Sequence, residues 1–245
     1  IQLENICKQY TNHNHTVRAV DNVSFSVAPN ERVGIAGGSG SGKSTLLRLI
    51  AMLEKPTSGT LRLFGEDISQ IQNHTEVYRL LQMMFQNPLA VIPPRMNLEA
   101  FLLEPYINYG LMDMAAAKDD IRKWMQRVDL PENTVNKYPH EVSGGQLQRV
   151  VLARIMLMNP KLVLFDEPTS ALDAVNQKLV LDLLQKIYTE QPFGYVFVSH
   201  DIGLLQAITD RIIVMKDGQI VETIESKRLK EAVHPYTQAL VEASV

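Results

Sequence analysis

The sequence contains a single cysteine, Cys7, among its 245 residues. One thiol cannot form a disulfide within the chain and cannot build a thiolate metal cluster, so disulfide-stapled and cysteine-cluster proteins are excluded. We expect Cys7 to fill space in a strand, as a lone thiol usually does. The cysteine content fits a reducing cytosol.

Long apolar runs are also missing. No segment approaches 18 consecutive apolar residues, and the start of the chain shows no basic stretch followed by an apolar one. We therefore expect neither a membrane span nor a secretion signal in this chain. Because the sequence begins at Ile1 rather than Met, we expect that a few residues precede it.

The chain lacks an excess of positive charge. Its formal net charge is −3, and it has no long run of Lys and Arg, so nothing indicates a nucleic-acid partner. It also has no internal repeat and no low-complexity segment. Its length and ordinary apolar content allow one or two domains with a substantial core.

What the sequence does contain is a glycine-rich loop in a specific setting. Residues 37–44 fit the spacing Gly-x-x-x-x-Gly-Lys-[Ser/Thr]. An apolar run at 33–36 precedes the loop, and a helical pattern at 46–50 follows it. Strand, loop and helix in this order are the context that a phosphate-binding loop requires. The alternative is a flexible loop of Gly and Ser.

The chemistry of this loop predicts a polyphosphate ligand. Glycines allow backbone N–H groups to turn inward around an anion, and the N-terminus of the following helix adds the positive end of its dipole. Lys43 would reach the β- and γ-phosphates, and Ser44 would hold Mg²⁺. The predicted binding residues of the loop are Gly37, Gly38, Ser39, Gly40, Ser41, Gly42, Lys43, Ser44 and Thr45.

Two carboxylates, Asp166 and Glu167, follow a continuous apolar run at 162–165. Such a run is typical of a strand buried on both faces of a parallel sheet, and the residues after it lie at the edge where α/β proteins bind ligands. Asp166 could hold Mg²⁺ through water, and Glu167 could polarise a water for attack on the γ-phosphate. The alternative is that the two carboxylates cap the next helix.

His200 follows another buried run, 195–198, in the same way. It could hydrogen-bond the γ-phosphate or the attacking water, or it could simply cap a helix. Tyr10 closes the first predicted strand. It could stack on a purine ring, or it could be an aromatic residue at the edge of the core.

A second anion site is predicted where Ser143, Gly144, Gly145 and Gln146 open a helical pattern at 147–157. A Ser hydroxyl, the N–H groups of two glycines and a helix N-terminus are all suited to a phosphate. Physical reasoning leaves open whether both elements grip the same nucleotide.

The remaining patterns outline the architecture. Residues 1–36 indicate strands, and 88–158 is helical in character. Residues 162–208 alternate apolar runs with helices, and 212–221 predicts a hairpin with Asp-Gly in its turn. Within the helical block, an apolar stripe at helical spacing could pack internally or meet a partner; it consists of Ile121, Trp124, Met125 and Val128.

Two histidines near the start, His13 and His15, lie in a polar stretch that we expect to be a loop. They could ligate a metal ion. No carboxylate or third ligand accompanies them, so we favour a solvated loop.

Taken together, these motifs resemble the nucleotide-binding subunit of ATP-binding cassette (ABC) transporters, and the match covers nearly the whole chain. One departure is Val142, where the signature of the family usually opens with Leu. The resemblance implies an α/β P-loop NTPase core with an N-terminal antiparallel β part and an inserted α-helical subdomain. The implied core is discontinuous, at 1–87 and 159–245, and the helical subdomain is 88–158.

The resemblance also implies a role for each motif, with ATP and Mg²⁺ as cofactors. Tyr10 is similar to the adenine-stacking aromatic residue, Glu167 to the general base, His200 to the switch histidine. Gln86 is similar to the glutamine that senses Mg²⁺ and couples to the membrane subunit, so Ser44, Gln86 and Asp166 form the implied Mg²⁺ set. Residues Ser143, Gly144, Gly145 and Gln146 resemble the signature that closes over a nucleotide held by the opposite subunit, and Asp173 the loop at that dimer interface.

Two stretches narrow the resemblance. Residues 85–88 and 94–96, with 234–240 near the C-terminus, are similar to importer ATPases for oligopeptides, dipeptides and nickel or metal-chelate (metallophore) complexes. Residues 91–95 match that pattern more loosely. The resemblance implies integral-membrane permease subunits, a second ATPase chain in a heterodimer or homodimer, and an indirect extracytoplasmic solute-binding protein. The implied location is peripheral, on the cytoplasmic face of the cell membrane.

Two other functions compete with the importer. One is a soluble mechanical ABC protein, which would show a long coiled-coil insertion or two cassettes in one chain, and neither is present in this sequence. The other is the ATPase subunit of an exporter, against which only the C-terminal resemblance speaks.

Overall fold

The computed structural model describes residues 1–12, 15–87 and 91–244, and it forms two compact units. The first unit contains Ile1–Val77, Leu164–Glu167 and Gly194–Val245, and the second contains Tyr78–Val163 and Pro168–Phe193. The core and helical subdomain named above, with their boundaries at 88 and 158, stay a prediction. His13 lies outside the described residues, and strand β2 begins at His15.

The N-terminal part of the first unit is an antiparallel sheet of four strands in the order β2-β1-β4-β5. Its strands are β1 (Gln2–Asn12), β2 (His15–Ser26), β4 (Ser58–Leu63) and β5 (Glu66–Asp67). Apolar residues of β1 and β2 alternate with polar ones and are buried on one face, as a half-buried sheet requires. The predicted N-terminal antiparallel part is confirmed.

A second sheet of the first unit carries the site, with strands in the order β10-β9-β3-β8-β7. These are β3 (Arg32–Ala36), β7 (Leu162–Asp166), β8 (Gly194–Ser199), β9 (Arg211–Lys216) and β10 (Gln219–Glu225). Strand β3 pairs in parallel with β8 and β9, so the carboxyl ends of these three strands lie at one edge. Strands β9 and β10 form the predicted hairpin. Its turn residues Asp217 and Gly218 have φ of 51° and 80°, as an Asp-Gly turn between twisted strands requires.

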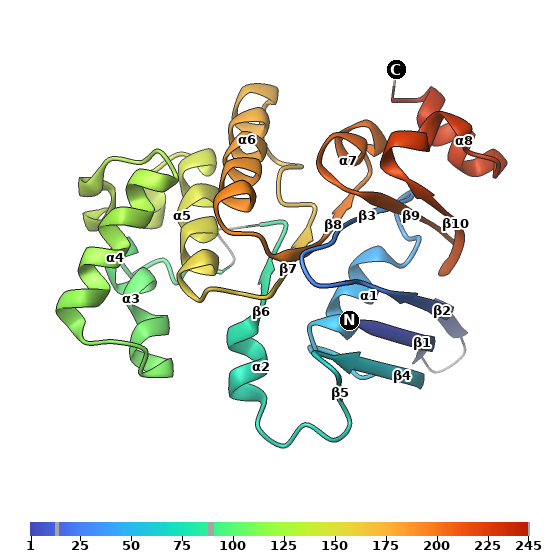
Figure 1. Ribbon diagram of the computed structural model, residues 1–245, viewed down its shortest axis with the longest axis horizontal. Coiled ribbons are helices and arrows are strands. Elements are labelled where there is room, and N and C mark those ends of the chain that lie inside the picture. The colour runs from blue at the N-terminus through green and yellow to red at the C-terminus, as the bar shows by residue number, and fades with distance from the viewer. Residues whose placement is uncertain (13–14, 88–90, 245) are drawn as a thin grey trace. The chain divides into compact units, whose positions relative to one another are not determined.

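The helices of the first unit flank this sheet. They include α1 (Lys43–Ile50), α7 (Ile202–Ile208), the 3-10 helix η4 (Ser226–Glu231) and α8 (Pro235–Glu242). Helix α7 packs against β3 and β8, and α8 packs against α7 and η4 (Figure 1). Helix α2 (His74–Leu80) passes from the first unit into the second.

The second unit is mainly helical. It contains β6 (Leu81–Met84), α3 (Leu98–Tyr109), α4 (Met114–Arg127), the 3-10 helices η2 (Glu132–Asn136) and η3 (Pro139–Glu141), α5 (Gly144–Leu157) and α6 (Ala174–Glu190). Helices α3, α4 and α5 pack on one another (Figure 1). Local sequence explains their ends: Asn97 and Asp113 accept hydrogen bonds as N-caps of α3 and α4, and Gly110 ends α3 with φ of 60°.

The apolar stripe predicted in the helical block belongs to the core of the second unit. Each of its four residues, Ile121, Trp124, Met125 and Val128, is at most 5% exposed. The stripe therefore packs internally, and it leaves no free surface for a partner. Among the described helices, none has the length and apolar character that crossing a membrane would require.

Candidate nucleotide site

The glycine-rich loop connects β3 to α1 in the first unit, as predicted. Gly37 and Gly42 have φ of 152° and 99°, and the space around them is closed. A Cβ at Gly37 would lie 2.3 Å from the Met215 carbonyl oxygen, and one at Gly42 would lie 2.2 Å from that of Ala19. Glycine is therefore required at both positions by conformation and by space. At these two positions the loop packs closely against its neighbours, which favours an ordered phosphate loop over a flexible loop of Gly and Ser.

Lys43 lies inside this loop and is 5% exposed. Its Nζ donates hydrogen bonds to the carbonyl oxygens of Gly37 and Gly38, each at 2.8 Å. Burial lowers the pKa of Lys43, and the carboxylates of Glu167 and Asp166 oppose this shift. The loop thus surrounds an ammonium group whose hydrogen-bond partners are two carbonyls and the Ser41 hydroxyl, all uncharged. An anion would form a stronger hydrogen bond with this ammonium than these neutral groups do.

The start of α1 has no side-chain cap. Its N-cap residue is Gly42, which contributes no hydrogen-bonding side chain. The first N–H groups of a helix have no partner within the helix, and together with the helix dipole they favour a negative charge. With Lys43 in the first turn, the loop and the start of α1 form a cradle that fits a polyphosphate.

Asp166 and Ser44 meet beside this cradle. Ser44 Oγ donates to Asp166 Oδ1 at 2.8 Å, although the two residues are 122 positions apart. Burial raises the pKa of Asp166, and the hydrogen bond from Ser44 acts in the opposite direction. A hydroxyl and a carboxylate are hard oxygen donors of the kind that Mg²⁺ prefers.

Among the described residues, side chains alone do not enclose a metal ion. In the described parts of the chain, no group of three or more His, Cys, Asp or Glu side chains could hold one. This fits Mg²⁺, which in nucleotide sites is held by one or two protein groups together with phosphates and water. Ser44 and Asp166 are the residues that would hold it in the first unit.

Glu167 and His200 come together at the same sheet edge. His200 Nδ1 lies 3.7 Å from Glu167 Oε2, and the Glu167 N–H donates to the Val198 carbonyl at 3.2 Å. The side chain of His200 is 67% exposed. Glu167 has φ of 46°, a left-handed conformation that is strained for a residue with a side chain and that is frequent at functional sites.

The capping alternatives for these residues are not what the structure shows. Helix α7 is capped by Asp201, whose Oδ1 accepts from the Leu204 N–H at 2.9 Å. Helix α6 is capped by Asp173, whose Oδ1 accepts from the Asn176 N–H at 2.9 Å. The side-chain caps of these two helices are therefore Asp201 and Asp173, and not His200, Asp166 or Glu167.

Tyr10 lies on β1 and is 41% exposed. Its hydroxyl donates to Glu54 Oε2 at 2.5 Å, and Lys8 Nζ lies 5.0 Å from the ring centroid. Burial and the contact with Glu54 raise the pKa of Tyr10. This exposure fits both an aromatic residue at the edge of the core and a ring that is open to a ligand. Stacking on adenine stays a prediction.

The predicted signature residues lie in the second unit, at the start of α5. Ser143 and Gln146 form a reciprocal capping box: Ser143 Oγ accepts from the Gln146 N–H, and Gln146 Oε1 accepts from the Ser143 N–H. A Cβ at Gly145 would lie 2.8 Å from Asn176 Oδ1, whereas around Gly144 the space is open. The backbone at Gly144 is thus open to close approach by another group.

Two other predicted site residues, Gln86 and Asp173, have hydrogen-bond partners within the second unit. Gln86 Nε2 donates to Ser170 Oγ at 3.3 Å. Asp173 also accepts from Asn176 Nδ2 at 2.6 Å, and its hydrogen bonds with Asn176 lower the pKa of Asp173. Asn176 was missed in the sequence, where its only signal is a position three residues after an N-cap aspartate.

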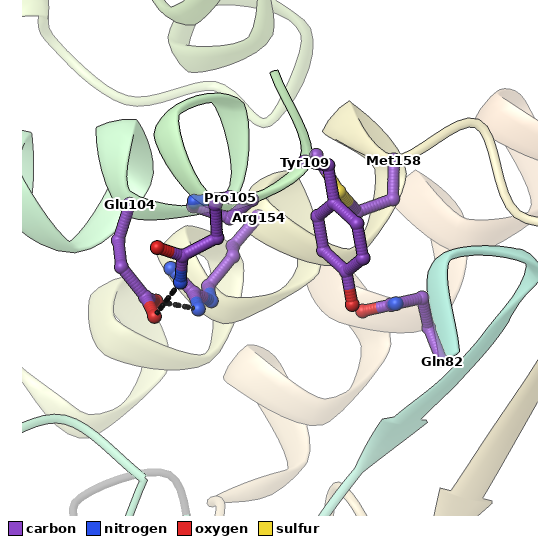
Figure 2. Close-up of a pocket in the computed structure, with 7 residues that line it drawn as sticks. Gln82, Glu104, Pro105, Tyr109, Arg154 and Met158 are labelled. Atoms are coloured by element: carbon purple, nitrogen blue, oxygen red, sulfur yellow. Dashed lines mark hydrogen bonds and ion pairs between the residues drawn. The ribbon is translucent and has the colours of Figure 1, made fainter. Parts of the chain in front are cut away.

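A cavity of about 150 Å³ opens in the second unit beside α3 (Figure 2). It is lined by Gln82, Glu104, Pro105, Asn108, Tyr109, Arg154 and Met158. It is smaller than the roughly 300–1,000 Å³ of most small-molecule sites. Its cation, Arg154, is already paired with Glu104. The cavity is therefore a poor site for a nucleotide.

Comparisons with known proteins identify the family. A family model described as ABC transporter matches residues 20–170. AppF, an oligopeptide transport ATP-binding protein of Bacillus subtilis (strain 168), is 39% identical over 92% of this chain and 70% of its own length. A putative peptide import ATP-binding protein of Brucella ovis is 37% identical over 99% of this chain and 78% of its own length.

A solved structure is similar over most of the fold. It is the dimeric structure of an ATP-binding cassette in a post-hydrolysis state, bound to ADP and Pi. It is 31% identical to this chain with a TM-score of 0.83, and the match covers 92% of this chain and 98% of that one. The predicted cassette fold is confirmed. The chain belongs to the ABC transporter family, as one of its ATP-hydrolysing subunits.

Proposed function

We propose that this subunit drives the import of peptides through separate membrane subunits. The ATPase function is supported by one observation: Lys43, Ser44 and Asp166 lie together at the phosphate-binding loop. Peptides are supported by the relatives, because both of those named above are described for peptide transport or import. Neither is described for nickel or metal chelates.

In the proposed reaction, the residues of the first unit bind and activate the reactants. The N–H groups of the loop and Lys43 hold the β- and γ-phosphates of ATP. Mg²⁺, held by Ser44 and Asp166, would neutralise phosphate charge when bound. The role of Gln86 toward Mg²⁺ stays a prediction. Glu167 accepts a proton from a water that attacks the γ-phosphorus, and the bond to the β,γ-bridging oxygen breaks to release ADP and phosphate. His200, 3.7 Å from Glu167, orients that water or the γ-phosphate.

The second unit supplies the groups that a partner needs. We propose that Ser143, Gly144, Gly145 and Gln146 face a nucleotide held by the partner chain, and that Asp173 lies at the same interface. The open space around Gly144 supports this role. In this arrangement two nucleotides are sandwiched between two ATPase chains, and the adenine stacks on Tyr10.

The remaining partners follow from the importer hypothesis. The chain would bind permease subunits at the cytoplasmic face of the membrane, with a second, different ATPase chain as its partner. A solute-binding protein on the other side would deliver the cargo without contact with this chain.

The experiment is ATP turnover by the complex of this chain, its permease subunits and a second ATPase, reconstituted in vesicles with the solute-binding protein. We expect short peptides to stimulate turnover and nickel or nickel chelates to leave it unchanged. Stimulation by nickel chelates and not by peptides would show that the cargo is a metal chelate. Transport of substrate out of cells, with no dependence on a binding protein, would show an exporter.

A further inference from the structure

The C-terminal segment reaches the phosphate loop through one side chain. Tyr236, in the first turn of α8, places its hydroxyl so that it accepts a hydrogen bond from the Gly38 N–H at 2.7 Å. A Cβ built on Gly38 would lie 3.1 Å from this hydroxyl. Both residues belong to the first unit, although 198 positions separate them.

Tyr236 is held in place by its own surroundings. The Tyr236 N–H donates to His234 Nδ1 at 3.1 Å, which caps α8. The Glu222 carboxylate on β10 accepts from the N–H groups of Val233 and His234, at 2.8 and 3.2 Å. Lys216 Nζ lies 5.2 Å from the centroid of the Tyr236 ring. The hydroxyl therefore meets the loop with little conformational freedom.

The contact falls on the residue of the loop that Lys43 also holds. The Gly38 carbonyl accepts from Lys43 Nζ at 2.8 Å, while the Gly38 N–H donates to Tyr236. Gly38 is thus fixed on both sides, by the phosphate-binding lysine and by the C-terminal segment. Because Gly38 is fixed, the backbone that follows it, with its N–H groups, is also restricted in orientation.

We propose that Tyr236 is a positioning residue of the ATP site. Its hydroxyl holds the first half of the phosphate loop in the binding conformation before ATP arrives, so less conformational freedom is lost on binding. Tyr236 acts through Gly38 and takes no part in the chemistry. The inference rests on ATP binding at this loop and not on the proposed cargo.

The test is Tyr236→Phe in the full chain, which removes the hydroxyl and keeps the ring over Lys216. Loss of one hydrogen bond predicts that the Kd for MgATP rises about two- to tenfold. In the complex with the membrane subunits, KM for ATP rises by a similar factor, while kcat stays close to that of the wild type. If Tyr236 had only a structural role, Tyr236→Phe would lower the melting temperature without raising KM at an unchanged kcat.

Tyr195→Phe is the matched control. Its buried hydroxyl donates to the Ile208 carbonyl in the same unit, away from the loop. We expect this variant to lower the melting temperature and to leave the Kd for MgATP unchanged. An equal loss of affinity in both variants would show general loosening of the unit and would overturn the proposal.

A double-mutant cycle with Gly38→Ala tests the contact itself. The added methyl group should push the Tyr236 hydroxyl away and weaken MgATP binding in the wild-type chain. In the Tyr236→Phe chain the same substitution should add little, because the hydroxyl is already gone. Full additivity, or an unchanged Kd in Tyr236→Phe, would overturn the proposal. Either result would leave the peptide importer untouched, because stimulation by peptides is measured separately with the wild-type complex.

Discussion

Two helices of this molecule begin at glycine-rich stretches, and they differ in how their first backbone N–H groups are capped. Helix α1 starts at Gly42 without a side-chain cap, and a buried ammonium lies beside it. Helix α5 starts at Ser143, which forms a capping box with Gln146, and no ammonium stands at a comparable place in its first turn. Stretches of similar composition thus begin two helices that are capped differently, and we predict a different kind of anion site at each.

The difference indicates how much of each site one chain supplies. The first cradle gathers its lysine, its hydroxyl and its carboxylate within one unit, so we expect it to bind ATP without a partner chain. The second satisfies part of its own hydrogen bonding and offers an open approach at Gly144. It is suited to a phosphate that is already held elsewhere. This comparison predicts that the two elements fail in different ways when they are changed.

The largest effect should come from Glu167→Gln, which leaves both helix starts intact. The amide keeps the shape of the side chain but cannot accept the proton, so turnover should fall by about 10²–10⁴-fold, the usual contribution of a general base. MgATP binding should survive, and ATP-bound dimers should accumulate, as measured by size-exclusion chromatography with light scattering. Undiminished turnover with free monomers would count against Glu167 as the base.

Lys43→Ala breaks the first cradle. Removing its charge at the β- and γ-phosphates should lower turnover by about 10²–10³-fold, the typical cost of losing one preorganised donor. Unlike Glu167→Gln, it should also weaken MgATP binding by the isolated chain, as measured by calorimetry. Turnover at the wild-type rate would discard the phosphate role of Lys43.

Gly144→Asp breaks the second element and leaves the first untouched. The new carboxylate would face the phosphate of the partner's nucleotide, so like-charge repulsion should block closure of the dimer. ATP binding by the isolated chain should remain normal, and the loss should appear only in turnover and in ATP-dependent dimerisation. Normal hydrolysis by this variant in the full complex would rule out the proposed dimer, in which each nucleotide lies between the two ATPase chains.

Mixing the two variants sharpens the comparison, in conditions where the chain forms homodimers. In a dimer of one Lys43→Ala chain and one Gly144→Asp chain, one composite site carries both lesions and the other carries neither. Partial recovery of hydrolysis on mixing would show that Gly144 acts on the partner's nucleotide. If each chain used only its own two elements, every site would stay defective and no activity would return.

The smallest effect concerns Asp166, the carboxylate of the first cradle. Burial raises its pKa above the ordinary value, so its ionised form destabilises the nucleotide-free fold, and this cost disappears as the pH falls through that pKa. Asp166→Asn should therefore raise the melting temperature at pH 7 and have less effect at acidic pH, while weakening Mg²⁺-dependent ATP binding. A lower melting temperature at pH 7 would contradict this assignment.

The sequence predicted most of the elements because their signals are local. Helices α6 and α7 lie within 162–208, where apolar runs were expected to alternate with helices, and the Asp-Gly turn joins β9 to β10 as expected. Helix α6 begins at Ala174, directly after its N-cap residue Asp173. The carboxylates and His200 were predicted at one edge because the ends of neighbouring parallel strands meet there.

Other contacts had no signal in the sequence. The bond between Tyr236 and Gly38 joins residues 198 positions apart, and no periodicity or spacing encodes it. The same holds for Asn176 beside Gly145, which depends on how α5 and α6 pack. Such pairs are set by tertiary packing, and a pattern read along one chain does not contain them.

The left-handed backbone at Glu167 has a consequence for the engineering of this protein. A side chain held at φ of 46° costs on the order of 1 kcal/mol, and Gly or Asn would relieve much of that cost. Selection of variants for heat resistance alone would therefore favour replacement of Glu167. The survivors would be robust proteins without the base that we propose for hydrolysis, so any such selection needs a parallel assay for turnover.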